Sequence, residues 1–153
     1  MLTCSVVGAT SFTGSELIRI LARHPHVKIG CLTTRSEAPT YARHLVTALG
    51  KSIDLVIEKF DFRKVAKHSD AVFLTLPHTL AMKAAGDFYD QGKVVIDLSA
   101  DFRLSRPEVY EKWYGQRLSR KSLLRHAAYG LPEIYREKIK QANLIANPGC
   151  YPT

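Results

Sequence analysis

The feature that most constrains the fold is a repeated alternation between short, continuous apolar runs and segments with helical spacing. Continuous apolar runs, rather than alternating ones, are typical of strands buried on both faces. Strands that alternate with helices predict a parallel, doubly wound sheet. We therefore predict an α/β protein with a Rossmann-like, mostly parallel sheet and helices on both faces. The predicted strands are Leu2–Val7, Val27–Thr34, Ile53–Glu58, Asp70–Leu76, Lys93–Ser99 and Asn143–Asn147.

Segments of helical spacing follow most of these strands. Pro25 is expected to stop the first helix, Thr79 to cap the third and Gly92 to end it. Element boundaries carry no clear signal between Glu37 and Lys51 or between Leu104 and Arg125. The predicted helices are Gly14–His24, Asp61–His68, Thr79–Gly92, Pro107–Tyr114 and Glu133–Ala142.

The length of 153 residues suits one domain with a real core. Lysine and arginine exceed the acidic residues by 22 − 14 = 8, which favours an anionic partner. The basic stretch Gln116–His126 is interpreted as a solvated helix face, because no nucleic-acid motif or interleaved aromatic pattern accompanies it. No apolar run approaches the roughly 18 residues of a membrane span, and the N-terminus lacks a basic leader. We expect a cytoplasmic protein without a membrane or nucleic-acid partner.

The three cysteines are an odd number without a C-x-x-C pair, which argues against a disulfide framework and a zinc site. No metal site is predicted. Cys4 and Cys31 lie in apolar, strand-like runs and are interpreted as small buried hydrophobes. Cys150 instead follows a Pro-Gly turn after the last strand, where an open sheet places its ligands. We interpret Cys150 as a nucleophile, the alternative being a terminal cysteine exposed by truncation.

A glycine turn, "GATSFTG" (Gly8–Gly14), joins the first strand to the first helix. Gly8 allows a tight turn, amides at the helix start can hold a pyrophosphate, and Gly14 allows close helix–strand packing. The turn departs from a strict G-x-G-x-x-G pattern, with Ser11 in the middle. Its position after the first strand favours nucleotide binding.

The end of the second strand indicates which nucleotide. An NAD enzyme offers a carboxylate to the ribose roughly 20 residues past the turn. Here Arg35 and Ser36 stand in that region, although Glu37 is close. A cation and hydroxyls suit a 2′-phosphate, so we predict a preference for NADPH. The alternative is a solvent-exposed loop arginine.

A thiolate combined with a nicotinamide suggests one reaction class. The sulfur attacks an activated acyl group, and hydride reduces the resulting thioester to an aldehyde. An acyl phosphate substrate fits the basic surface.

Six stretches, in order along the whole chain, resemble the N-terminal part of the N-acetyl-gamma-glutamyl-phosphate reductases. The first is also shared with aspartate-semialdehyde dehydrogenases. The resemblance implies NADPH-dependent reduction of an acyl phosphate to N-acetylglutamate semialdehyde in arginine biosynthesis, with release of phosphate. The stretches are "VVGATSFTGSELIRIL", "TTRS", "FLTLPHT", "VIDLSADFRL", "YGLPE" and "NPGCYPT".

The resemblance also implies roles for individual residues. Cys150 matches the nucleophile, and Ser99, Arg103 and Asn147 are the expected substrate-binding residues. Two of the matched residues have non-catalytic alternatives: His78 as a loop histidine near a helix start, and Arg103 as a brace paired with Asp101 or a neighbouring acid. The expected cofactor-binding residues are Gly8, Ala9, Thr10, Ser11, Phe12, Thr13, Gly14, Arg35, Ser36, Pro77 and His78.

The chain departs from the family pattern in two ways. Ser11 replaces the usual middle glycine of the turn, which implies a less close approach of the backbone to the pyrophosphate. Family members also continue into a second domain with a general-base histidine, most substrate contacts and the oligomer interface. We therefore interpret residues 1–153 as an NADP-binding domain that ends at the catalytic cysteine and binds NADPH without turnover. The full-length enzyme is expected to be a homo-oligomer.

Two other functions stay open at this point. Related reductases act on a carrier-protein-bound aminoadipyl phosphate in lysine biosynthesis, and the residues that read the substrate lie mostly in the second domain. A stand-alone module that binds nucleotide or nucleic acid is the other alternative. The intact "NPGCYPT" argues against that module, because a sensor needs no poised thiol.

Overall fold

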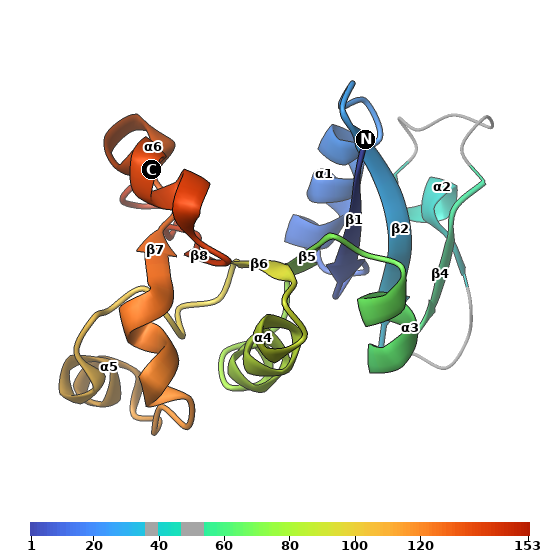
Figure 1. The fold of residues 1–153 in the computed structure, drawn as a ribbon. Coiled ribbons are helices and arrows are strands. Elements are labelled where there is room, and N and C mark those ends of the chain that lie inside the picture. The colour runs from blue at the N-terminus through green and yellow to red at the C-terminus, as the bar shows by residue number, and fades with distance from the viewer. Residues whose placement is uncertain (36–39, 47–53) are drawn as a thin grey trace. The chain divides into compact units, whose positions relative to one another are not determined.

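The computed structural model describes residues 1–35, 40–46 and 54–153. It divides into two compact units, Met1–Thr75 and Leu76–Thr153, which we describe one at a time. Figure 1 shows their helices and strands in chain order. The predicted α/β fold class, with a mostly parallel Rossmann-like sheet, is confirmed.

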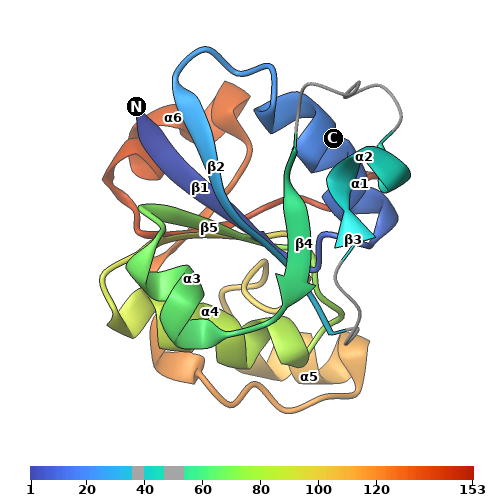
Figure 2. The same cartoon turned by 90° about the vertical axis from the view of Figure 1, so that its right-hand side faces the viewer.

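The first unit is built on a sheet with strand order β3-β4-β2-β1-β5. All its pairings are parallel except that of β3 with β4. Figure 2 shows α1 and α3 on opposite sides of strands β1 and β2. The elements are β1 (Leu2–Val7), α1 (Phe12–Leu21), β2 (Val27–Thr34), β3 (Thr40–Tyr41), α2 (Ala42–Leu45), β4 (Val56–Lys59), α3 (Phe62–Lys67) and β5 (Ala71–Leu74).

The direction of winding reverses at β1. The chain passes outward from β1 to β2 and β4, then returns to β5 on the other side of β1. Open α/β sheets bind ligands outside the carboxyl ends of the strands at such a reversal. The glycine turn leaves β1 at that end of the strand.

The strand interiors of this unit are buried on both faces. Cys4–Val7 and Cys31–Thr34 are buried, so the interpretation of Cys4 and Cys31 as buried small residues is confirmed. Burial raises the pKa of both thiols. The buried Ser5 hydroxyl within β1 accepts hydrogen bonds from the Cys31 N–H (2.8 Å) and the Ser69 hydroxyl (2.6 Å). Such pairing removes most of the cost of burying a hydroxyl.

Helix α1 begins two residues earlier than predicted because Ser11 caps it. The Ser11 hydroxyl accepts a hydrogen bond from the Gly14 N–H (2.9 Å). The helix ends at Leu21, before Pro25. A Cβ on Gly14 would lie 2.5 Å from the Gly8 carbonyl oxygen, so the predicted close packing of helix on strand is confirmed.

The second unit has three parallel strands in the order β6-β8-β7. Helix α4 packs on β6 and α6 on β7 (Figure 1). The predicted helix Pro107–Tyr114 is confirmed at both ends. The elements are α4 (Leu80–Asp90), β6 (Val94–Asp97), α5 (Pro107–Tyr114), the 3₁₀ helix η2 (Lys121–His126), β7 (Ala127–Tyr129), α6 (Pro132–Gln141) and β8 (Leu144–Ala146).

Four short elements were not predicted: β3, α2, η2 and β7. Within the basic stretch Gln116–His126, Lys121–His126 form the 3₁₀ helix η2; Leu118 and Leu123 are buried, and most of the other residues are exposed. Two of its cations form ion pairs: Arg120 pairs with Asp90, and the Lys121 ammonium lies 3.1 Å from the Glu111 carboxylate. Elements of two to six residues are too short to show a hydrophobic period. Across the described ranges, no helix is long and apolar enough to cross a membrane.

The prediction that Thr79 caps α4 with its side chain is wrong. Thr79 has φ +70°, outside the extended region that an N-cap residue adopts, and its hydroxyl makes no capping bond. The Asp101 carboxylate caps the helix instead, accepting from the N–H groups of Thr79 and Met82. A cap supplied 22 residues away leaves no local signal. Gly92, with φ +70°, follows the helix as expected.

We predict that Gly8→Ala destabilises the protein by about 2 to 4 kcal/mol. Gly8 has φ +97°, and a Cβ there would lie 2.6 Å from the Thr75 carbonyl oxygen. The matched control is Gly115→Ala, which also has positive φ (+64°) but no atom within 4 Å of the added Cβ. This control should lose only about 1 kcal/mol. Urea denaturation followed by circular dichroism measures both, and equal losses would contradict the prediction.

Candidate functional site

The glycine turn is held to the tips of β2 and β5. The N–H groups of Gly8 and Ala9 both donate to the Thr33 carbonyl (2.9 Å each), and the Ser11 N–H donates to the Gly8 carbonyl (3.0 Å). The Thr75 hydroxyl also donates to the Gly8 carbonyl (2.8 Å). The turn is therefore fixed from both neighbouring strands before any ligand binds.

Ser11 does not need to be glycine. Its backbone lies at φ −73° and ψ 159°, an extended conformation open to any residue. Its side chain caps α1, so Ser11 has a structural role at the position where the family pattern has a glycine. How closely the pyrophosphate approaches this turn stays a prediction.

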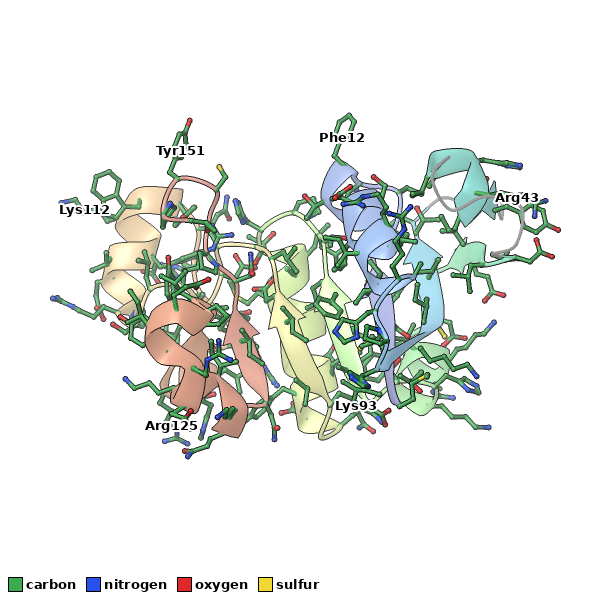
Figure 3. The ribbon with its side chains drawn as sticks, turned by 90° about the horizontal axis from the view of Figure 1, so that it is seen from above. Phe12, Arg43, Lys93, Lys112, Arg125 and Tyr151 are labelled. Carbon is green, nitrogen blue, oxygen red and sulfur yellow. The ribbon has the colours of Figure 1, made fainter. Side chains whose placement is uncertain are left out.

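The turn presents unpaired backbone donors at the start of α1. No described residue accepts a hydrogen bond from the N–H groups of Thr10, Phe12 or Thr13, and all three residues are exposed. Figure 3 shows the Phe12 ring pointing away from the rest of the chain. Unpaired amides at the positive end of a helix dipole form an anion-binding site. The residues present therefore fit a nucleotide pyrophosphate.

Arg35 lies directly after β2, beside this turn. The Thr34 and Thr10 hydroxyls are 3.0 Å apart, which ties the end of β2 to the turn. Arg35 is exposed, so its guanidinium is accessible to an anion. Ser36 and Glu37, the other residues considered at this strand end, lie outside the described residues.

In the second unit, His78 sits in the turn between β5 and α4. Its Nδ1 accepts a hydrogen bond from the Ala100 N–H (3.1 Å), and its ring lies edge-on to Tyr114 with centroids 5.4 Å apart. A neutral imidazole that accepts at Nδ1 carries its proton on Nε2. His78 therefore offers a donor N–H from an exposed ring. The adjacent Pro77, also exposed, accepts the Ala81 N–H at its carbonyl (3.2 Å).

Ser99 is buried and shapes the loop after β6. Its hydroxyl donates to Asp97 (2.8 Å) and accepts from the Asp101 N–H (3.1 Å), and its own N–H donates to Asp97 (2.9 Å). Burial raises the pKa of Asp97 to about 6, while the hydrogen bonds from Ser99 lower it. A substrate contact by Ser99 stays a prediction, with its hydroxyl engaged in this loop.

Arg103 braces the ends of two strands. Its Nε donates to the Asn147 carbonyl (2.7 Å) and its Nη2 to the Leu98 carbonyl (2.8 Å). The structure gives it no salt bridge to Asp101 or any other described acid, so the alternative role as a brace rests on carbonyl oxygens, and substrate binding by Arg103 stays a prediction. Its Nη1 lies 3.1 Å from the position of a Cβ on Gly149. The guanidinium thus stands against the turn that precedes Cys150.

The turn that carries Cys150 is held by its neighbours. The Asn147 side-chain amide donates to the Pro148 carbonyl (3.0 Å), and the Asn147 N–H donates to the Asp97 carbonyl (2.8 Å). The Thr153 hydroxyl donates to the Gly149 carbonyl (3.0 Å). Cys150 itself is an exposed free thiol, unlike Cys4 and Cys31. Figure 3 shows the adjacent Tyr151 projecting from the same segment.

The structure groups the predicted residues within each unit. The first brings the glycine turn next to Arg35, and the second brings Ser99, Arg103 and Asn147 into one hydrogen-bonded set at the ends of β6 and β8. Sequence reasoning missed the organising roles of Thr75 and Asp97, and it named Asp101 only as a possible partner of Arg103. The available signal for Asp97 and Asp101 was that they are the two carboxylates in "IDLSAD", a segment whose other residues are apolar or small. The described residues hold no group of three His, Cys, Asp or Glu side chains suited to a metal ion.

A glycine turn that offers free amides at a sheet reversal indicates a nucleotide-binding α/β domain. The family described as "semialdehyde dehydrogenase, NAD binding domain" matches residues 3–142. The chain belongs to this family.

The chain is similar over its whole length to enzymes named N-acetyl-gamma-glutamyl-phosphate reductase. It is 44% identical to the one from Heliobacterium modesticaldum, 46% to the one from Pelobacter propionicus and 45% to the one from Geobacter metallireducens. It spans 44% of the length of each of these relatives.

Solved structures share the fold. Aspartate semialdehyde dehydrogenase II from Vibrio cholerae superimposes with a TM-score of 0.63 at 17% identity, over 99% of this chain and 39% of that one. The enzyme from Candida albicans, solved with NADP, gives a TM-score of 0.55 at 20% identity, over 70% of this chain and 32% of that one. At these identities the likeness shows the fold alone.

The raised pKa of Asp97 predicts that its contribution to stability falls as the pH rises. Its folded pKa is about 6, against an ordinary value of 3.8. The contribution is therefore fully present below the ordinary value and is lost as the pH rises through the folded one. At about 1.4 kcal/mol per pKa unit, wild type should lose about 2 to 3 kcal/mol relative to Asp97→Asn between about pH 4 and 7. Urea denaturation at both pH values measures this, and a pH-independent difference would contradict it.

Proposed function

We propose that this chain is the NADPH-binding part of an N-acetyl-gamma-glutamyl-phosphate reductase. The observation that carries the proposal is the exposed Cys150 thiol in a turn braced by Arg103, in a chain that also carries a dinucleotide turn. The whole-chain identity of 44–46% to reductases of that name supports this substrate over an aminoadipyl phosphate. The reaction would belong to arginine biosynthesis and take place in the cytoplasm.

The proposed chemistry begins at Cys150. Its thiolate attacks the carbonyl carbon of the acyl phosphate, a C–S bond forms, and the C–O bond to phosphate breaks as inorganic phosphate leaves. NADPH, when bound, supplies the hydride that reduces the carbonyl carbon of the thioester. Cys150 then departs as the C–S bond breaks, which releases the aldehyde and regenerates the thiolate.

The proposed cofactor-binding residues of the first unit are those of the glycine turn with Arg35 and Ser36, and those of the second unit are Pro77 and His78. The free N–H groups of Thr10, Phe12 and Thr13 suit the pyrophosphate, and Arg35 with Ser36 suits the 2′-phosphate. Ser99, Arg103 and Asn147 are proposed on the substrate side, where an arginine matches the charge of an acyl phosphate. No nucleic-acid or membrane partner is proposed.

We propose that residues 1–153 form the NADP-binding domain and that a further domain supplies the general base and the homo-oligomer interface. The chain spans 44% of the length of its relatives, which supports this division. The isolated chain is then expected to bind NADPH without turnover. Reductase activity of the isolated chain would contradict this division.

We predict that the chain binds NADPH at least tenfold more tightly than NADH and that Arg35→Ala removes most of this preference. A hydrogen bond to a charged group contributes about 1.5 to 3 kcal/mol, which corresponds to about tenfold to a hundredfold in affinity. Calorimetric titration with both nucleotides measures it. Arg63→Ala is the control, because it removes the same charge from an exposed position of α3. If both substitutions reduced the preference for NADPH equally, the reduction would come from the lower net charge, and the prediction for Arg35 would be contradicted.

We predict that Cys150→Ser in the full-length protein lowers reductase activity by about a thousandfold or more, because a hydroxyl is a far weaker nucleophile. The affinity for NADPH should stay within about twofold. Cys31→Ala, at a buried cysteine outside the site, is the control and should keep most of the activity. The assay follows NADPH oxidation with the acyl phosphate as substrate. Activity retained by Cys150→Ser would exclude the thioester route.

A further inference from the structure

Asp101 is a fully buried carboxylate that the proposed chemistry does not use. It lies in the loop after β6 and is 0% exposed. One oxygen accepts from the N–H groups of Thr79 and Met82 (2.9 Å each), and the other accepts from the Tyr110 hydroxyl (2.6 Å). Hydrogen bonds from these three donors compensate the cost of burying the carboxylate. The carboxylate therefore joins the loop to the start of α4 and to α5.

The start of α4 depends on this carboxylate. Among the residues that the structure describes, Thr79 is the only non-glycine residue with a positive φ (+70°). Such a backbone is unfavourable for a residue with a side chain and persists only when its surroundings enforce it. Asp101 supplies both the partner for the Thr79 N–H and the negative charge that the N-terminus of α4 favours. Thr79, the residue with this strained backbone, directly follows His78 in the chain.

The same loop sets the His78 ring. The Ala100 N–H, one residue before Asp101, donates to His78 Nδ1 (3.1 Å). Tyr110, bonded to Asp101, stacks on Tyr114 with ring centroids 4.9 Å apart, and Tyr114 packs edge-on against His78. The imidazole is thus held by a hydrogen bond and by a ring contact, and Asp101 connects both.

We propose that Asp101 is a positioning residue that fixes the His78 ring with Nε2–H as a hydrogen-bond donor to an acceptor oxygen of the bound nucleotide. This inference rests on the proposed function, because the ligand is NADPH. Asp101 itself would touch neither substrate nor cofactor. Its effect on binding passes through His78.

The first arm of the test needs no ligand. Nitrogen NMR of the chain at about pH 8, where imidazoles are neutral, reports the tautomer of each histidine, and His78→Phe assigns the signal. Wild type should show the Nε2–H form of His78, and Asp101→Asn should shift it toward a mixture. Tyr110→Phe, a milder change, should shift it in the same direction. A wild-type ring protonated at Nδ1, or a tautomer unaffected by both variants, would overturn the proposal.

The second arm is a double-mutant cycle on NADPH affinity. Asp101→Asn should weaken binding about tenfold in the wild-type background and less than twofold in the His78→Phe background. Equal weakening in both backgrounds would overturn the proposal, because Asp101 would then act only through stability. Asp61→Asn is the matched control, since Asp61 caps α3 through the Lys64 N–H. It should change neither the tautomer nor the affinity.

The two arms separate this inference from the proposed function. Absence of NADPH binding by the folded wild-type chain would overturn the proposed function and the ligand part of this inference. The NMR arm still decides whether Asp101 positions His78. NADPH binding that is equally tight in wild type and Asp101→Asn would overturn the inference and leave the proposed function standing.

Discussion

The burial of parallel strands on both faces is the constraint on which the rest of the structure depends. In strand interiors such as Cys4–Val7 and Cys31–Thr34 a buried polar side chain costs free energy unless it is paired, as Ser5 is; the buried Thr33 hydroxyl has no hydrogen-bond partner among the described residues. Polar and reactive groups are therefore displaced to the carboxyl ends of the strands. The glycine turn, Arg35 and the Cys150 turn each stand at such an end because the sheet offers them no other place.

The two units meet this constraint with different chemistry. In the first, backbone groups fix the turn. The Thr33 carbonyl accepts hydrogen bonds from the Gly8 and Ala9 N–H groups, and the amides at the start of α1 stay available to an anion. In the second, the ionisable side chains of the buried Asp101 and the half-buried Arg103 hold the loops. Asp101 organises the start of α4, and Arg103 ties the carbonyl ends of β6 and β8. Removing one partner of such a pairing costs more than the pairing contributes, so these loops have few alternative conformations.

Sequence reasoning succeeded where structure follows from nearby residues. Leu2–Val7 and Val27–Thr34 were predicted at both ends, because apolar strands bounded by glycine, proline or polar residues carry their own signal. The fold class followed from that alternation. The glycine turn was also recognisable, because Gly8 and Gly14 answer steric demands that no other residue meets. The short elements η2 and β7 had no such signal.

Contacts between distant residues could not be predicted in the same way. The cap on α4 comes from Asp101, and the brace on the Cys150 turn comes from Arg103, 44 residues before Asn147. A sequence shows that Arg103 is charged and near a strand end, but it does not show that its partners are carbonyl oxygens. For the same reason Ser99, expected beside substrate, was not foreseen as a buried support of Asp97. The roles of these residues depend on where the loop lies, which tertiary packing decides.

The arrangement around Cys150 separates the reactive group from the groups that hold it. Asn147, Thr153 and Arg103 make the hydrogen bonds that shape the turn, and the thiol is exposed. A nucleophile must reach its substrate and leave it again, which a side chain with a structural duty does less readily. In the proposed reaction the turn can therefore keep its shape while the sulfur changes from thiol to thioester and back. The same separation applies to His78, whose Nδ1 is bonded to the Ala100 N–H while Nε2 stays available. In both cases the hydrogen bonds of neighbouring residues fix the local conformation, and the Cys150 thiol and the His78 Nε2 stay accessible to a ligand.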